Sequence, residues 1–95
     1  MAVHFLSTTL TFNRPGVGTW RVNFAKPIIS AGANIQGFDI GFAPDDHELR
    51  TLSIKVQNVE WSGTEVIGEV VFLLQDDSDH EGKGTITVGV AAELE

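Results

Sequence analysis

Apolar and polar residues alternate with a period close to two in six stretches of this chain. Successive side chains of a β-strand point to opposite faces of a sheet, so this period is typical of strands with one buried and one solvated face. Residues 49–57 show it most clearly, because Leu52, Ile54 and Val56 alternate with polar residues. Apolar spacings of three and four do not fit this stretch, so the pattern favours a strand over a helix.

Turn residues separate the first two stretches. The first predicted strand runs from Val3 to Phe12 and ends at residues 13–18, where one proline and two glycines favour a chain reversal. Trp20, Val22 and Phe24 then share one face of a second strand. We expect the two strands to pair as a hairpin and the Trp20 side chain to pack in the core.

Small residues dominate the next segment, and Ser30 to Asn34 predicts a bend. A third strand is expected from Ile35 onward, with Phe38, Ile40 and Phe42 on one face.

The phase of the fourth strand breaks near its end. Asn58 to Trp61 interrupt the alternation, which predicts a β-bulge or a strand end, and Ser62-Gly63 predicts a short turn. Trp61 therefore fits either the edge of the core or an exposed contact.

The last two strands are the most apolar. Residues 64–75 carry apolar side chains on both faces, which predicts a central strand or one that a neighbouring subunit covers. Residues 85–94 alternate again, and the residues expected to point inward are Ile86, Val88, Val90 and Ala92.

Six strands of this length bury their apolar faces most simply as two packed sheets. The sequence therefore predicts an all-β fold, a six-stranded antiparallel β-sandwich, as a single domain over residues 1–95. A closed barrel would produce the same alternation and is the alternative architecture.

Composition narrows the possible partners. Thirteen acidic residues against six Lys and Arg give a formal net charge of −7, with no basic cluster. Nucleic acids and anionic membrane surfaces attract cationic proteins, so neither is an expected partner. The chain has no cysteine, and its first residues show neither a signal peptide nor a membrane span, so we expect no membrane insertion and a cytoplasmic protein or one released by a non-classical route.

Acidic residues cluster in two predicted loops, around residues 45–48 and 76–81, each of which also holds a histidine, His47 or His80. Calcium prefers six to eight oxygen ligands, so two such loops at one end of a sandwich suit a calcium site. The candidate metal ligands are Asp45, Asp46, Asp77 and Asp79. The spacing does not follow an EF-hand, and turns commonly attract Asp, Ser and His without any metal, so solvated loops are the competing explanation and no cofactor is required.

Catalysis is not predicted. Ser78 lies near Asp and His residues, but neighbours in one short loop usually point apart, whereas a catalytic triad must converge in a pocket. We therefore expect a protein that is not an enzyme.

Several short motifs resemble the H-type lectin family over roughly residues 24–94. They are Phe24-Ala25-Lys26-Pro27-Ile28, Gly37-Phe38-Asp39, residues 49–59 (LRTLSIKVQNV) and Gly63-Thr64-Glu65-Val66. The resemblance implies a six-stranded antiparallel sandwich, trimers or larger oligomers, and binding of N-acetylgalactosamine-type sugars between subunits. It also implies that Arg50, which matches the arginine opening the family's central strand, contacts sugar. The family's sugar-contacting aromatic in a Thr-Trp-x-Asp stretch has no counterpart here, because the chain continues through Leu73 and Leu74 to Asp76.

The predicted function is a noncatalytic, oligomeric binding or adhesion module with a carbohydrate-like ligand. The candidate ligand-binding residues are Arg50, Asp76, Asp77, Ser78 and Trp61. Two alternatives remain open at this point. One is a structural subunit of a larger assembly, such as a phage tail or surface appendage, and the other is a calcium-stabilised domain.

Overall fold

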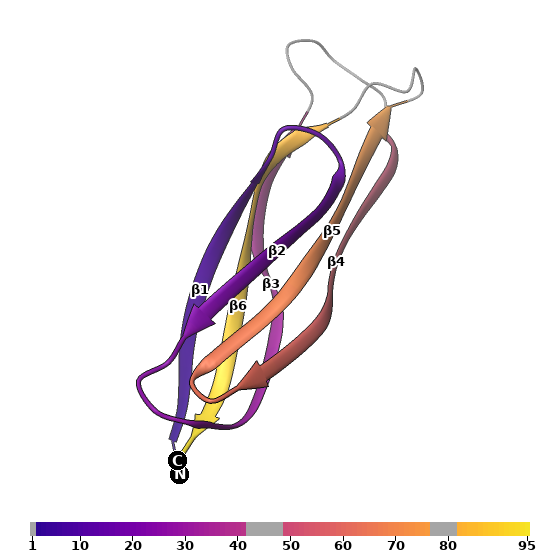
Figure 1. Ribbon diagram of the computed structural model, residues 1–95. Coiled ribbons are helices and arrows are strands. Elements are labelled where there is room, and N and C mark those ends of the chain that lie inside the picture. Colours follow the sequence, from indigo (N-terminus) through magenta and orange to yellow (C-terminus); the bar gives the residue numbers. More distant parts are fainter. Residues whose placement is uncertain (1, 42–48, 77–81) are drawn as a thin grey trace.

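The computed structural model describes residues 2–41, 49–76 and 82–95, and these form six β-strands (Figure 1). The strands are β1 (Ala2–Phe12), β2 (Gly16–Asn23), β3 (Ile28–Gly41), β4 (Leu49–Ser62), β5 (Glu65–Asp76) and β6 (Lys83–Leu94). No helix in the described part of the chain is long and apolar enough to cross a membrane.

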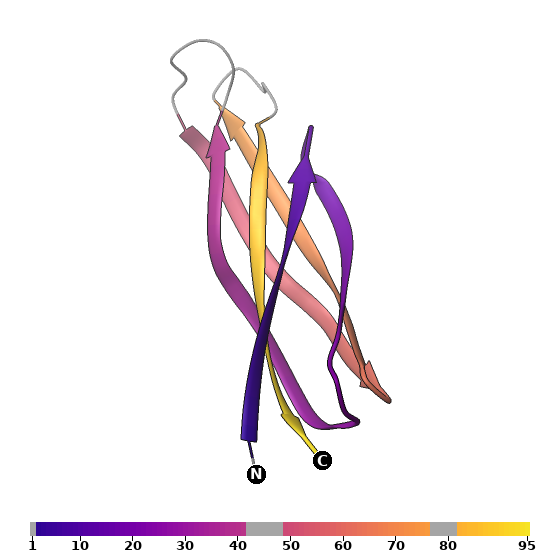
Figure 2. The same cartoon turned by 90° about the vertical axis from the view of Figure 1, so that its left-hand side faces the viewer.

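The strands form two three-stranded antiparallel sheets, with the orders β1-β6-β3 and β2-β5-β4. The sheets pack face to face with β1 near β2 and β3 near β4, as the two views in Figures 1 and 2 show. The molecule measures 50 × 18 × 16 Å along its principal axes, so the strands run along a long, thin sandwich. This arrangement confirms the predicted all-β, six-stranded antiparallel β-sandwich. The described strands form two separate sheets and not a closed barrel, so the alternative architecture is excluded.

The core lies between the two sheets and follows the predicted alternation. In β6, Ile86, Val88 and Val90 are buried, while the residues between them are partly exposed. In the part of the chain that the structure describes, the buried apolar residues are Phe12, Trp20, Val22, Phe24, Val66, Val70, Phe72, Leu74, Ile86, Val88, Val90, Ala92 and Leu94. Trp20 is 3% exposed, which confirms its predicted core position.

The predicted hairpin between the first two strands is wrong. β1 pairs with β6 and β2 pairs with β5, so the turn after Phe12 carries the chain from one sheet to the other. The burial of Phe12 and Trp20 explains this path, because strands in opposite sheets can point both large side chains into the space between the layers.

The predicted bend at Ser30–Asn34 is also wrong, because these residues lie inside β3. Ala31 and Ala33 pair with β6 and pack against the core, while an irregularity in register occurs earlier, between Ile28 and Ser30. Small side chains therefore mark close packing in a strand here and not a turn.

Two apolar side chains on edge strands are more exposed than the alternation predicts. Ile54 and Val56 pack against the core as predicted, but Leu52 is 43% exposed although it pairs with the buried Leu74. Phe38 is likewise 55% exposed opposite Ile86. Both residues lie on edge strands, which neighbours cover on one side only.

The β4–β5 hairpin matches its prediction. Its register shifts between Gln57 and Glu60, and Asn58 in this bulge has φ of 53°. Ser62 pairs with Glu65 across a turn whose Gly63 has φ of 61°, a value that favours glycine. β5 is the central strand of its sheet, which confirms that part of its prediction.

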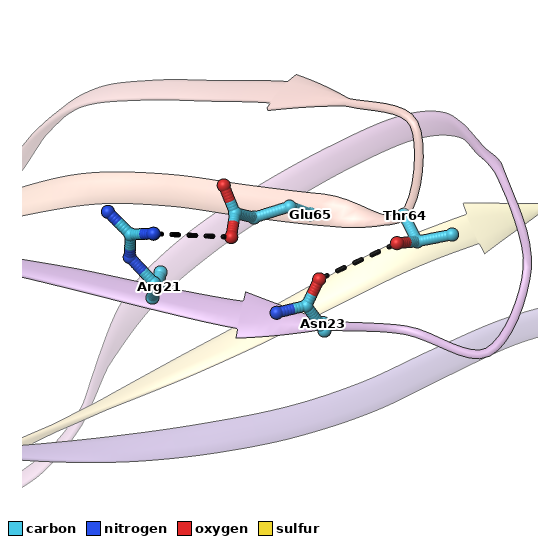
Figure 3. A network of polar contacts seen from close by, with 4 residues as sticks. All are labelled: Arg21, Asn23, Thr64 and Glu65. Carbon is cyan, nitrogen blue, oxygen red and sulfur yellow. Dashed lines mark hydrogen bonds and ion pairs between the residues drawn. The ribbon is translucent and has the colours of Figure 1, made fainter.

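Backbone hydrogen bonds tie this turn to the connection between β2 and β3. Phe24 N and Ile28 N donate to Thr64 O and Gly63 O, both at 2.8 Å. Figure 3 shows the side chains beside them: Arg21 lies 3.6 Å from Glu65, and Thr64 Oγ1 lies 3.5 Å from Asn23 Oδ1. Arg21 is largely exposed, so this ion pair contributes little, and the backbone hydrogen bonds fix this end of the sandwich.

Candidate binding groove

The predicted site residues lie in different parts of the chain. Arg50 and Asp76 belong to the paired ends of β4 and β5, where Leu49 is the register partner of Asp76. Trp61 lies eleven residues beyond Arg50 on the same strand, which is roughly 35 Å at the usual rise per residue. The structure therefore does not bring Trp61 together with Arg50 and Asp76.

Trp61 is 42% exposed and is not among the residues that pack against the core, so of the two alternatives it is an exposed surface side chain. It lines a shallow depression with Glu60, Ser62, Glu65 and Ile67, and the volume of this depression is about 90 Å³. Ligand pockets usually measure about 300 to 1,000 Å³, so this depression is too small for a sugar-sized ligand.

The acidic-loop predictions fall outside the described residues. This applies to Asp45, Asp46, Asp77, Ser78 and Asp79, and the calcium site built from four of them stays a prediction. Within residues 2–41, 49–76 and 82–95, no group of three or more His, Asp or Glu side chains is arranged to hold a metal ion.

A larger groove lies on the outer face of the β1-β6-β3 sheet. Its volume is about 370 Å³, within the range of small-molecule sites. All three strands contribute to its lining, which consists of Phe5, Leu6, Gly32, Asn34, Gln36, Gly89, Val90 and Ala91.

The floor of the groove exists because β6 and β3 carry small residues where they pair. Gly89 pairs with Asn34 on β3 and with Ser7 on β1, and Ala91 pairs with Gly32 and Phe5. Larger side chains at Gly89 and Ala91 would fill the middle of the sheet face. With glycine and alanine there, the outer side chains of β1 and β3 stand above the floor as walls.

Two side-chain amides converge at the β3 wall. A β-carbon added at Gly89 would lie 2.9 Å from Asn34 Oδ1 and 3.3 Å from Gln36 Oε1, so both amides reach over the same point of the floor. The register shift between Ile35 and Gly37 makes Gln36 the additional residue of a bulge. Asn34 and Gln36 are two residues apart, so their side chains share the outer face of β3.

The opposite wall is aromatic. Phe5 is 76% exposed, the largest exposure among the large apolar residues of the described chain. A second hollow of about 340 Å³ lies on the other side of Phe5 and Leu6, where His4, Asn23, Phe24, Ala25 and Leu94 complete its lining. Both hollows therefore border β1.

The chemistry of the groove suits an uncharged ligand. Its lining contains no Asp, Glu, Lys or Arg, so it offers no counter-charge to an ion. An amide both donates and accepts hydrogen bonds, which matches hydroxyl and acetamido groups, and an exposed aromatic ring provides an apolar contact surface. A general acid, base or nucleophile is not among the side chains that line this groove.

The sequence alone does not predict this groove. The amides at Asn34 and Gln36 were a signal, since they are two residues apart, but Asn34 fell in the segment expected to bend. Strand pairing is what brings Asn34, Gly89 and Phe5 onto one sheet face, and their positions in the chain do not indicate it.

No protein-family model, curated protein or solved structure matches this chain.

Proposed function

We propose that this chain is a noncatalytic, oligomeric binding module that recognises a carbohydrate-like ligand. The observation that carries the proposal is the groove on the β1-β6-β3 sheet, where the Asn34 and Gln36 amides converge over Gly89 opposite the exposed ring of Phe5. A pyranose has an apolar face that packs on an aromatic ring and an equatorial rim of hydroxyl groups that bind amides.

The oligomeric part of the proposal is supported by the outer face of the other sheet. Ile67, Val71 and Leu73 lie on the side of β5 away from the core and are only partly covered, and Val17, which pairs with Val71, is 58% exposed. Neighbouring apolar residues on a surface commonly mark a protein contact.

The resemblance to H-type lectins supports the same class of ligand but indicates a different place for it. The resemblance assigns sugar contact to Arg50 on β4, whereas the groove is formed by the other sheet. We propose the groove as the primary site, and this choice makes the two hypotheses separable by mutation.

Binding to an array of neutral, acetamido and sialylated glycans tests the proposal, followed by titration with free galactose and N-acetylgalactosamine. We expect saturable binding of a neutral or acetamido sugar. Asn34→Ala and Gln36→Ala should each weaken it about three- to tenfold, the usual effect of losing one hydrogen bond. Asn13→Ala removes an exposed amide in a turn away from the groove and should leave affinity unchanged.

A glycine pair provides a second test with little risk to folding. Gly89→Ala puts a methyl group where the two amides converge, and flexible side-chain ends can move away from it, so the variant should fold and bind weakly. Gly37→Ala adds the same methyl group in open space and should bind normally. A silent array would overturn the glycan proposal, and a sugar lost with Arg50→Ala but retained by Asn34→Ala would move the site to β4.

A structural subunit of a larger assembly, such as a phage tail or surface appendage, is the second candidate function. It is favoured by the exposure of Val3, Phe5 and Val17, which are 58%, 76% and 58% exposed. This alternative predicts concentration-dependent assembly without saturable glycan binding.

A further inference from the structure

β1 is a long edge strand with one side of its backbone open. It pairs with β6 through eleven consecutive residue pairs, from Ala2–Leu94 to Phe12–Gly84, without a shift in register. Among the described residues, no strand pairs with its other side. Backbone N–H and C=O groups therefore point outward along that edge and can pair with another strand.

The other three edge strands carry features that discourage such pairing. β2 is only eight residues long and contains Arg21. β3 and β4 each have two register shifts, and β4 also contains Asn58 at φ of 53° together with Lys55. Short length, bulges and charged residues are the usual means by which proteins protect sheet edges.

β1 has none of these features. Its sequence, AVHFLSTTLTF, contains no Asp, Glu, Lys, Arg, Pro or Gly, although the whole chain holds 19 acidic and basic residues. Three large apolar side chains on its first half, Val3, Phe5 and Leu6, are 58%, 76% and 40% exposed. A partner strand along this edge would partly cover them.

Charge and symmetry favour a second copy of this chain as the partner. With a net charge of −7, two copies repel each other over most of their surfaces, and among the six strands β1 is the one without Asp, Glu, Lys or Arg. An antiparallel pair of identical strands is self-complementary, so it forms a closed two-fold dimer and leaves neither β1 edge open.

We propose that two copies pair antiparallel through their β1 edges and form one continuous six-stranded sheet with the order β3-β6-β1-β1-β6-β3. This inference rests on the oligomeric part of the proposed function and not on its ligand. In such a dimer the partner's β1 lies next to Phe5, so the grooves of both copies open on the same extended sheet face.

Sedimentation of the whole chain with a lysine substitution tests the interface. The wild-type chain should sediment as a dimer of the 10.3 kDa chain. Ser7→Lys introduces a charge on the exposed outer face of β1 and should raise the dimer dissociation constant at least about tenfold. Thr19→Lys makes the matched change on the edge strand β2, beside the apolar outer face of β5, and should leave the dimer intact because the proposed contact is at β1 and not at that face.

Single-cysteine variants test the same interface even if the Ser7→Lys variant does not fold. The chain has no cysteine of its own, so Val3→Cys, Phe5→Cys, Ser7→Cys and Thr9→Cys sample the outer face of β1 without background. At least one of them should form a disulfide-linked dimer under mild oxidation, whereas Thr19→Cys should not.

Three outcomes would overturn the proposal: a wild-type monomer at millimolar concentration, a Ser7→Lys dimer as tight as the wild type, or an oligomer with an odd number of subunits. Glycan binding measured on the same samples keeps the two hypotheses distinct. A dimer with a silent array contradicts only the ligand, whereas a sugar-binding monomer contradicts this interface and the oligomeric part of the proposed function but leaves the ligand proposal standing.

Discussion

Asn58 Nδ2 donates a 2.6 Å hydrogen bond to Glu69 Oε1 across the β4–β5 pair. Gln57 Nε2 donates to the same oxygen at 3.2 Å. Asn58 lies in the β4 bulge with φ of 53°, a region that asparagine adopts more readily than most residues. One residue therefore supplies both the backbone conformation of the bulge and a side-chain hydrogen bond to the neighbouring strand.

Two substitutions separate these contributions. Asn58→Ala loses the hydrogen bond and puts a residue that adopts a positive φ less readily than asparagine into the bulge, so the free energy of unfolding should fall by about 1 to 2 kcal/mol. Asn58→Gly loses the same hydrogen bond but relieves the backbone, so its loss should be smaller. Urea unfolding of both variants measures the difference, and an equal loss in the two would show that backbone conformation is unimportant here.

The same hydrogen bonds predict a pH dependence. Those from Asn58 and then Gln57 stabilise the ionised carboxylate and hold the pKa of Glu69 below its ordinary value of 4.5. A carboxyl group whose folded-state pKa is lowered stabilises the fold above its unfolded-state pKa, and this stabilisation is lost as pH falls through the folded-state pKa.

Wild type should therefore have a higher Tm than Glu69→Gln at pH 7, and the difference should shrink as pH falls below about 4.5. Glu60→Gln removes a carboxylate from the β4 strand of the same sheet and serves as the control for the change in net charge. A gap between wild type and Glu69→Gln that stays constant down to pH 3 would contradict the role assigned to these hydrogen bonds.

Local pattern was sufficient to predict the buried face of the central strand β6, but not burial on the edge strands, where Leu52 and Phe38 are exposed. Period-two alternation alone predicts that Ile86, Val88 and Val90 lie in the core, because a strand fixes the face of every side chain, and all three are buried. The bulge near Asn58 was predictable for the same reason, since an additional residue shifts the phase of the alternation.

Which strands pair with one another was not predictable from local pattern. The turn at residues 13–15 reverses the chain equally well for a hairpin and for a crossing between sheets, and burial of Phe12 and Trp20 across the core decides between them. The groove was missed because it depends on the register of β1 and β3 on β6. Contacts between residues distant in sequence form both features, and no single segment contains the information.

The packing of Trp20 predicts a strong effect of a small substitution. Gly68 is the register partner of Trp20, and a β-carbon at position 68 would contact ring atom Cζ2 directly and lie 2.8 Å from Cε2. Trp20 is 3% exposed, so the ring or the strand must shift within the core to admit the methyl group, and Gly68→Ala should lower the free energy of unfolding by about 1 to 3 kcal/mol.

Gly16→Ala is the matched control for that substitution. The added methyl group meets no atom within 4 Å at this position of the same sheet. Urea midpoints for the two variants should differ clearly, and a Gly68→Ala midpoint equal to that of Gly16→Ala would mean that the indole ring moves without cost.

The contact between Phe12 and Phe72 joins the two sheets. Their ring centroids are 5.2 Å apart with an interplanar angle of 48°, and the rings come from β1 and β5. Phe72 is 1% exposed, so Phe72→Ala removes a buried ring and leaves a cavity between the layers. The free energy of unfolding should fall by about 3 to 5 kcal/mol, a large part of the stability of a domain this size.

Phe72→Leu keeps most of the buried volume but removes the aromatic pair, so it should cost clearly less than Phe72→Ala. Leu52→Ala truncates an apolar side chain that is 43% exposed and should have the smallest effect of the three. Urea unfolding followed by far-UV circular dichroism ranks them. If Leu52→Ala destabilised the protein as much as Phe72→Ala, the core would not lie between β1-β6-β3 and β2-β5-β4, because truncating an edge residue would then remove as much buried apolar surface as truncating a residue between the sheets.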